Sequence, residues 1–442
     1  MNVDGARLRG AGPGTRAVGS VERLRSHLRV PLYRSAYALS LSALGSAGLG
    51  AVFWAAAAHL YDREVVGSSS AAVAALAFVA GVAGLYLDGV LYRFLPAAGA
   101  ASRRLVAVTA LVTLVTGIVG TAVFLLGIPV WAPGLSFLRT SAGVVVACAA
   151  ATVTTCLLVL EDAVLTALRR TGWVPVKNLV LSALKIPVLV LLAGSASTYG
   201  ILIGWTVPVV AVAAVAAYAL YGRAVPAAMR RARTADEPLD RMHITRYAAG
   251  NYVGYLCTLA YRTLPPIVVL HEAGAASAAS FYPPWLLATS ISLLVTNLSV
   301  SLVVEGALER ERLAVHVRQA VLQTARLIVP IAAALVLLAP YLLRIFGAAY
   351  ATDGTDLLRL LAVSLIPGSV CILGFGAARV RDHVRSIIVN QVALASLTLG
   401  LAIGLIGPLG LAGVGVACLA GQTAIGAVLS VTELLPALRG RA

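Results

Sequence analysis

The segment GRAVPAAMRRARTADEPLDRMHIT, residues 222–245, is the longest polar connection between the apolar stretches of this chain of 442 residues. Crossing a lipid bilayer takes roughly 20 mostly apolar residues in a helix, and stretches of that length fill the chain on both sides of the segment. The stretches lie at roughly 33–60, 69–95, 104–128, 140–168, 173–193 and 199–221, then at 246–270, 279–305, 320–343, 356–378, 384–406 and 409–436. The pattern predicts an all-α polytopic membrane protein with about 12 transmembrane helices.

The polar segment separates two equal sets of spans. Because each set holds an even number, both sets enter the bilayer from the same side. The sequence therefore predicts two six-helix lobes, an N-lobe over 33–221 and a C-lobe over 246–436, related as a parallel pseudo-repeat. Residues 222–245 are the predicted inter-lobe loop, and residues 1–32 and 437–442 are the predicted terminal tails.

Positive charge gathers in alternate gaps between the spans. Most of the 34 Lys and Arg residues lie in the N-terminal tail, after every second span and at the C-terminus. By the positive-inside rule, the N- and C-termini and the inter-lobe loop are cytoplasmic. In the tail, apolar residues at helical spacing over 16–34 predict a short amphipathic helix on the membrane surface. Basic loops that face anionic membrane lipids thus account for the net charge of +16. We therefore expect no nucleic-acid partner.

Sequence motifs give no support to an enzyme. The chain contains no G-x-x-x-x-G-K-[ST], no H-E-x-x-H and no G-x-S-x-G. Its five cysteines all fall inside predicted spans and form no C-x-x-C pair, while the six histidines have no metal-ligand spacing. We therefore expect no catalytic residues, no metal site and no cofactor.

Ionisable residues at membrane depth are the best candidates for function, because each costs about 2.5–3.5 kcal/mol near a helix centre. Lys185 and Arg262 are the two deep cations of interest, and Asp88, Glu161 and Asp162 are the acidic candidates. Two interpretations stay open. Lys185 forms a structural ion pair with Glu161 or Asp162 across the hairpin of spans 4 and 5. Alternatively, Lys185 and Arg262 line a central cavity and bind an anionic head group, while the three carboxylates couple transport to H⁺ or Na⁺.

Four stretches resemble the polysaccharide-flippase branch of the multidrug/oligosaccharidyl-lipid/polysaccharide (MOP) exporter superfamily. The first is LEDAVLTALRRTGWVPVKNLVLSALKIPVLVLLA, whose acidic residue, paired Arg, Trp, Asn and Lys follow that branch's usual order. The second contains a Phe-Gly-x-x-Tyr connection similar to that of the family. The stretches are Leu160–Ala193, LLRIFGAAYATDGTDLLRLLAVSLIP (Leu342–Pro367), ALGSAGLGAVFW (Ala43–Trp54) and LYRFLPAAG (Leu91–Gly99).

The resemblance implies two lobes around a central cavity that opens alternately to each side. It implies a flippase that moves a polyprenyl-diphosphate-linked oligosaccharide, a precursor of cell-envelope or extracellular polysaccharide such as lipopolysaccharide, from the cytoplasmic to the outer leaflet. It also implies the bacterial cytoplasmic membrane as the location, with a polysaccharide polymerase and glycosyltransferases of the same pathway as partners. The chain departs from the branch in lacking a dense set of arginines at membrane depth.

Three other classes of membrane protein share part of this pattern. A major-facilitator transporter also has two six-helix halves, but residues 88–104, DGVLYRFLPAAGAASRR, do not match its G-x-x-x-D-R-x-G-R-like segment. A drug/cation antiporter of the same superfamily would share the fold and stays open. A membrane-bound glycan polymerase or ligase would usually carry a sizeable external loop, and the predicted external connections are short.

Overall fold

The computed structural model describes residues 31–168, 172–194, 198–224 and 241–439. Nearly all of the predicted amphipathic helix and of the N-terminal tail, and most of the inter-lobe loop, lie outside these residues. Every regular element in the described part is a helix, which confirms the all-α prediction. Saturating the backbone hydrogen bonds within each segment is what a chain of this hydropathy needs in lipid.

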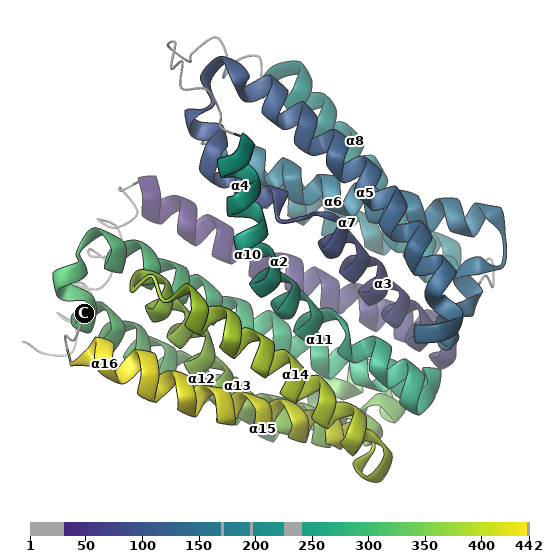
Figure 1. Cartoon of the computed structure of the whole chain (residues 1–442). Helices are drawn as coiled ribbons and strands as arrows, with labels where there is room; N and C mark the ends of the chain where they lie inside the picture. The colour runs from purple at the N-terminus through teal and green to yellow at the C-terminus, as the bar shows by residue number, and fades with distance from the viewer. Residues whose placement is uncertain (1–30, 169–171, 195–197, 225–240, 440–442) are drawn as a thin grey trace, which may run out of the picture.

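The first half of the chain forms one bundle, seen in purple to blue in Figure 1. Its spans begin with α2, and the second span is split into α3 and α4. The elements are α2 (Pro31–Leu60), α3 (Arg63–Ala83), α4 (Leu87–Phe94), η1 (Leu95–Ala97), η2 (Gly99–Ala101), α5 (Ser102–Trp131), η3 (Pro133–Arg139), α6 (Ala142–Ala167), α7 (Trp173–Ala193), α8 (Gly200–Ala219) and η4 (Leu220–Ala224).

The second half forms a second bundle, seen in green to yellow in Figure 1. In it α13 packs against α11, α12 and α15. The elements are α10 (Arg241–Thr263), α11 (Pro265–Leu308), η5 (Arg310–Arg312), α12 (Leu313–Arg344), α13 (Ala348–Val380), α14 (Val384–Leu409), α15 (Leu411–Leu429), η6 (Ser430–Leu434) and α16 (Leu435–Leu438).

The helix α11 contains a reversal of the chain at Gly274, whose φ of 82° and ψ of 175° are not helical. The indole N–H of Trp285 donates to the carbonyl of Arg262 at 3.2 Å. In a straight helix these residues would lie about 34 Å apart at 1.5 Å per residue, so the chain must double back between them. Residues 241–273 and 275–308 are therefore two crossings, as the sequence predicted.

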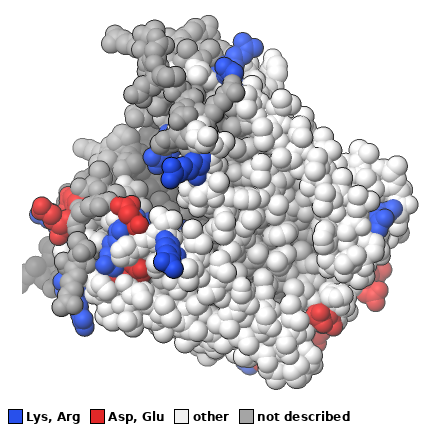
Figure 2. Space-filling view, in the orientation of Figure 1, with Lys and Arg blue, Asp and Glu red and all other residues white. Residues whose placement is uncertain are grey.

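The count of crossings agrees with the prediction of about 12. Ten helical segments of the described chain are long and apolar enough to span a membrane, and one of them, Ile244–Gly306, contains the reversal just described. The helix α2 adds a further crossing, of which residues Gly45–Leu60 are the described apolar part. Figure 2 shows a broad uncharged belt, with most Lys and Arg of this face gathered beyond one edge of it.

The second predicted span, 69–95, differs from expectation because it is broken in the middle. Leu85 and Tyr86 have positive φ values of 49° and 58°, so the helix stops after Ala83 and restarts at Leu87. Such a conformation is rare for residues other than glycine and persists only when the surroundings hold it. Here the Tyr86 ring lies 5.8 Å from the ring of Tyr255 on α10, which fixes the break against the other lobe.

The lobes meet through α2 and α3 on one side and α10 and α11 on the other (Figure 1). The helices approach closely at Gly67 of α3, where a Cβ would lie only 1.8 Å from the carbonyl oxygen of Ala275. Nearby, the rings of Trp54 on α2 and Tyr282 on α11 are 4.5 Å apart. The contact between lobes is therefore tight at the end of the bundle that the charge pattern predicts to be external.

Candidate functional site: a cavity between the two lobes

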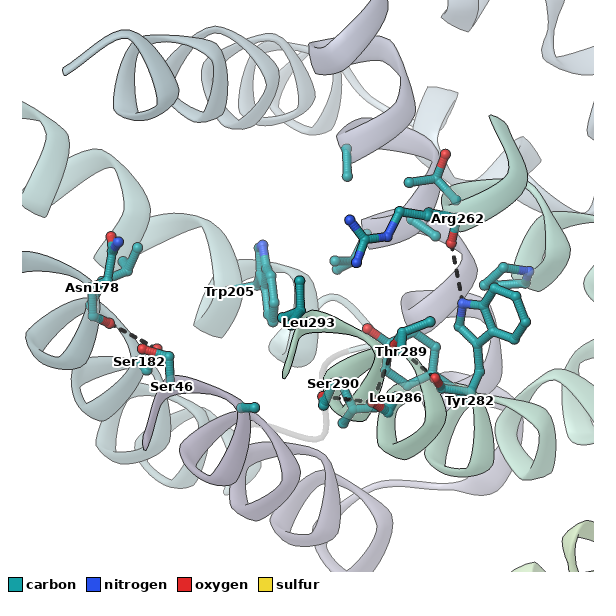
Figure 3. Close-up of a pocket in the computed structure, with 18 of the residues that line it drawn as sticks. Ser46, Asn178, Ser182, Trp205, Arg262, Tyr282, Leu286, Thr289, Ser290 and Leu293 are labelled. Atoms are coloured by element: carbon teal, nitrogen blue, oxygen red, sulfur yellow. Dashed lines mark hydrogen bonds between the residues drawn. The ribbon is translucent and has the colours of Figure 1, made fainter. Parts of the chain in front are cut away.

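A cavity of about 660 Å³ lies between the lobes. Helices α2, α3, α7 and α8 supply one wall, and α10 and α11 supply the other (Figure 3). Polar side chains line both walls, which a lipid-facing crevice would not need. They include Ser46, Asn178 and Ser182 from the N-lobe and Arg262, Thr263, Thr289 and Ser290 from the C-lobe.

Arg262 reaches this cavity from the last turn of α10. Two prolines that follow, Pro265 and Pro266, cannot continue the hydrogen bonding of that helix and instead begin α11. The carbonyl of Arg262 is held by the Trp285 indole, and its side chain points into the cavity in Figure 3. Within the described part of the chain, the guanidinium forms no ion pair. It is therefore free to bind a ligand.

Lys185 lies beside this cavity, in a smaller pocket of about 140 Å³ that we call the lysine pocket. The two spaces share Ser46, Trp205 and Tyr282 as wall residues. The side chain of Lys185 is 8% exposed, and its ammonium lies 3.1 Å from the centroid of the Trp205 ring. An indole face attracts a cation without neutralising it.

The aromatic platform under Lys185 is rigid because its rings pack on one another. Trp205 lies 5.6 Å from Phe53 and 6.3 Å from Trp54, ring centre to ring centre. Both Phe53 and Trp54 are almost fully buried. The sequence identified Lys185 but gave no indication of Trp205, because contact between α7 and α8 at this depth depends on how the two helices pack.

The carboxylates take a different partner from the one predicted. The ammonium of Lys177 lies 2.8 Å from Asp162 and 3.6 Å from Glu161. Lys185 forms no ion pair within the described residues, so the interpretation that pairs it with Glu161 or Asp162 is wrong. Lys177 lies two helical turns before Lys185 on α7, level with the carboxylates across the hairpin.

Neither Glu161 nor Asp162 lines the inter-lobe cavity or the lysine pocket. Asp88 is also absent from both walls and lies in the first turn of α4. The described walls thus contain one arginine, one lysine and no carboxylate. Within the described chain no group of three or more His, Cys, Asp and Glu is placed to hold a metal ion. The arrangement suits an anionic ligand with hydroxyl groups, because charge-assisted hydrogen bonds replace the hydration of the anion.

An ion pair joins the two lobes at the predicted external end. Arg63, the first residue of α3, pairs with Asp353 of α13 and also donates to Ser280 of α11. Its guanidinium lies 5.8 Å from the Tyr350 ring centre. The sequence reasoning missed this contact, although Tyr350 and Asp353 belong to the connection that resembles the family's Phe-Gly-x-x-Tyr element.

No protein-family model matches the sequence, and no curated protein sequence matches it either. Solved structures do match. An inward-facing multidrug resistance MATE family transporter of the MOP superfamily is 15% identical, with a TM-score of 0.70 over 90% of this chain and 95% of that one. Its outward-facing counterpart is 14% identical, with a TM-score of 0.65 over 93% and 97%.

A third solved structure also matches. It is a MOP superfamily transporter from Pyrococcus furiosus, described as having a binding pocket of reverse polarity that suggests a different function. It is 13% identical, with a TM-score of 0.59 over 93% of this chain and 97% of that one. The chain therefore has the fold of MOP superfamily transporters, over nearly its whole length.

Proposed function

We propose that this protein moves an anionic amphiphile across a membrane by alternating access, with the inter-lobe cavity as its binding site. The observation that carries the proposal is that Lys185 and Arg262, from opposite lobes, line adjoining spaces whose described walls hold no carboxylate. An unpaired cation at membrane depth carries a free-energy cost, so such a residue usually has a function such as binding a ligand. The substrate we propose is a polyprenyl-diphosphate-linked oligosaccharide, flipped from the cytoplasmic to the outer leaflet.

The chemistry of the walls matches the parts of such a substrate. The diphosphate carries the charge that Lys185 and Arg262 bind, and it cannot cross hydrocarbon without that compensation. The sugar offers hydroxyl groups to Ser46, Asn178 and Ser182. The cavity volume of about 660 Å³ is within the usual range for a small-molecule site.

The tight contact between the lobes at the predicted external end supports an inward-facing state. The Arg63–Asp353 pair and the Gly67–Ala275 contact hold the lobes together at the predicted external end. The inward-facing MATE structure also gives the higher TM-score of the two conformations, 0.70 against 0.65. In this state the substrate would enter from the cytoplasmic leaflet, and opening the external contact would release it.

A second candidate function is drug or cation antiport, and the named multidrug transporters among the matching structures favour it. A cationic drug would need an acidic or aromatic site with low positive charge. Arg262 and Lys185 would repel it, and the described cavity walls offer no carboxylate to offset them. A membrane-bound glycan polymerase is the weaker candidate, because no observation on the described residues favours it.

For coupling we propose Asp88, Glu161 and Asp162 as the candidates, with H⁺ or Na⁺ as the driving ion. Glu161 and Asp162 already share Lys177, so a proton or a Na⁺ ion would compete with that ammonium. The proposed location is the bacterial cytoplasmic membrane. There the protein would receive its substrate from glycosyltransferases and deliver it to a polymerase.

Substrate charge separates the two candidates directly. Wild-type protein reconstituted in vesicles is given either a fluorescent polyprenyl-diphosphate sugar or a fluorescent organic cation. The flippase proposal predicts transfer of the first across the bilayer and no protein-dependent movement of the second. Cation movement without any transfer of the lipid-linked sugar would overturn the proposal and support the antiporter.

A further inference from the structure

Three charged side chains join α6 to α7 inside the N-lobe, away from the walls of the inter-lobe cavity. Glu161 and Asp162 come from α6, and Lys177 comes from near the start of α7. The side chains of Glu161 and Lys177 are 6% and 7% exposed, whereas that of Asp162 is 25% exposed. Two carboxylates thus share one ammonium, which leaves one negative charge without a counterion among the described residues.

The two carboxylates are held differently. Asp162 lies 2.8 Å from the Lys177 ammonium and accepts from the Asn178 amide at 3.4 Å. The same ammonium is 3.6 Å from a Glu161 oxygen, which is beyond hydrogen-bond distance, and it donates to the carbonyl of Leu158 at 3.1 Å. That buried Glu161 oxygen has no hydrogen-bond partner within the described chain. Glu161 is therefore poorly stabilised as an anion, and binding a proton removes its charge.

Other titratable side chains near this group come from elements that pack against α6. Lys177 of α7 and Tyr221 of η4 interact electrostatically with Glu161. On α4, Tyr92 interacts with Asp162 rather than with Glu161. Lys177 is the one cation that acts on Glu161 in the described part of the chain, and Asp162 competes for it.

Glu161 also lines an apolar crevice of about 240 Å³ between α4, α5, α6, α8 and η4. The other described wall residues are Leu, Val and Ala, apart from Thr109 and Tyr221. The Thr109 hydroxyl donates to carbonyls of its own helix at 2.9 and 3.0 Å. Hard metal cations take several oxygen ligands, and these walls do not supply them to a Na⁺ ion. A proton needs only the carboxylate, so the crevice favours H⁺ over Na⁺.

The helix that carries Lys177 also carries the lysine of the lysine pocket. Lys177 and Lys185 lie eight residues apart on α7, about 12 Å along the helix axis. When Glu161 loses a proton, two carboxylates attract Lys177 instead of one. The added attraction acts on the helix that holds the Lys185 ammonium over the Trp205 ring.

We propose that Glu161 is the proton-binding residue of the transport cycle, that H⁺ is the coupling ion, and that Lys177 transmits the change of charge to Lys185 through α7. The proposal rests on the function proposed above and selects one residue and one ion from the candidates given there. The step is a proton transfer alone. A carboxylate oxygen of Glu161 accepts a proton from water and later returns it to water, while Asp162 stays ionised and keeps Lys177 in place.

Infrared spectroscopy of the full-length protein in zwitterionic nanodiscs tests the proton site without any transport. At neutral pH we expect wild type and the control Asp88→Asn to show the C=O band of a protonated carboxyl group, and Glu161→Gln to lack it. Glu161→Gln imitates the protonated form, so it should unfold at the wild-type temperature. In Asp162→Asn the band should weaken, because Lys177 is then left to Glu161 alone. No such band in wild type, or an equal band in Glu161→Gln, would overturn the proton site.

Flipping of a fluorescent polyprenyl-diphosphate sugar in vesicles, under an imposed pH or Na⁺ gradient, tests the coupling. Wild type and Arg326→Gln should respond to the pH gradient and not to the Na⁺ gradient, while Glu161→Gln should lose the response to pH. Arg326 is a suitable control because it is an exposed cation on α12 that lines neither this crevice, the inter-lobe cavity nor the lysine pocket.

A response to Na⁺ instead of pH, or equal pH responses in wild type and Glu161→Gln, would overturn coupling through Glu161. Failure of wild-type flipping with the carboxyl band intact would contradict the transport function and leave the proton site standing.

Discussion

Arg63 and Asp353 form an ion pair that joins the two lobes, since Arg63 begins α3 of the N-lobe and Asp353 lies in the first turns of α13 of the C-lobe. Both side chains are partly exposed, at 32% and 45%, so the pair contributes only about 0.2–1 kcal/mol. It lies at the same end of the lobe contact as Gly67 and Ala275. Its position therefore matters more for the choice between conformations than for the stability of either lobe.

Breaking this ion pair should favour the outward-open state. We expect Asp353→Asn to raise the outward-open population by less than about fivefold, given the energy of an exposed pair. The measurement is a spin-label distance between Ser136→Cys and Thr352→Cys, exposed positions on opposite lobes, in a background without the five native cysteines. The reversed pair Arg63→Asp/Asp353→Arg should restore the closed distance. No recovery in the reversed pair would show that the ion pair does not hold the lobes together.

Adding a methyl group at Gly67 should have a larger effect. A Cβ there would lie 1.8 Å from the Ala275 carbonyl oxygen, and both atoms involved are backbone or directly attached to it. Gly67→Ala should therefore destabilise the state in which the lobes are in contact at this end by about 1–3 kcal/mol, the usual cost of overpacking. The same label pair should report a longer distance.

Gly120→Ala is the matched control for Gly67→Ala. Its Cβ would meet Val79 at 3.5 Å, an ordinary contact within the N-lobe. An equal distance change in both variants, or none in either, would contradict the role of the Gly67 contact in closure.

The two lysines of α7 should respond in opposite ways to substitution by methionine. Lys177→Met leaves the buried Glu161 and the partly exposed Asp162 without their cation, which should destabilise the protein by about 3–5 kcal/mol. Lys185→Met removes a buried charge that has no carboxylate partner in the described chain, so unfolding should occur at an unchanged or higher temperature. Flipping should fall in Lys185→Met nonetheless. Similar thermal destabilisation in both variants would show that Lys185 is structural.

Cysteine labelling tests the orientation in the membrane, which rests on charge alone. Ser136→Cys lies in η3, a predicted external connection, and Glu311→Cys lies in η5, a predicted cytoplasmic one; both positions are exposed. In intact cells a membrane-impermeant thiol reagent should modify the first and not the second. The reverse pattern would invert the direction of transport proposed here.

Much of the fold was predictable because hydropathy acts over whole spans. Stretches of 20 apolar residues have few alternatives in lipid, so the twelve crossings were found from composition alone. The break at Leu85 and Tyr86 was not predictable, since neither residue favours positive φ. It depends on packing of Tyr86 against Tyr255, more than 160 residues later in the sequence.

The site was predictable only in part. Lys185 and Arg262 could be identified because burying a charge in a membrane costs free energy, and a lone cation in an apolar span is easily recognised in the sequence. Their partners did not stand out. Lys177 lies near the start of a predicted span, and nothing in the sequence shows that it binds both carboxylates; Trp205 is indistinguishable there from the other apolar residues of α8. Such assignments depend on the rotation of each helix about its axis, which packing between neighbouring helices of the N-lobe determines.

The most direct test is flipping of a fluorescent polyprenyl-diphosphate sugar in reconstituted vesicles by wild type, Lys185→Ala, Arg262→Ala and the control Arg326→Ala. If an anion crosses through the inter-lobe cavity, wild type and the control transfer the lipid at similar rates. The two cavity variants, folded by size-exclusion chromatography, transfer it about tenfold more slowly or less, as expected when a charge-assisted contact is lost. Undiminished transfer by both cavity variants would contradict the assignment of this cavity as the route.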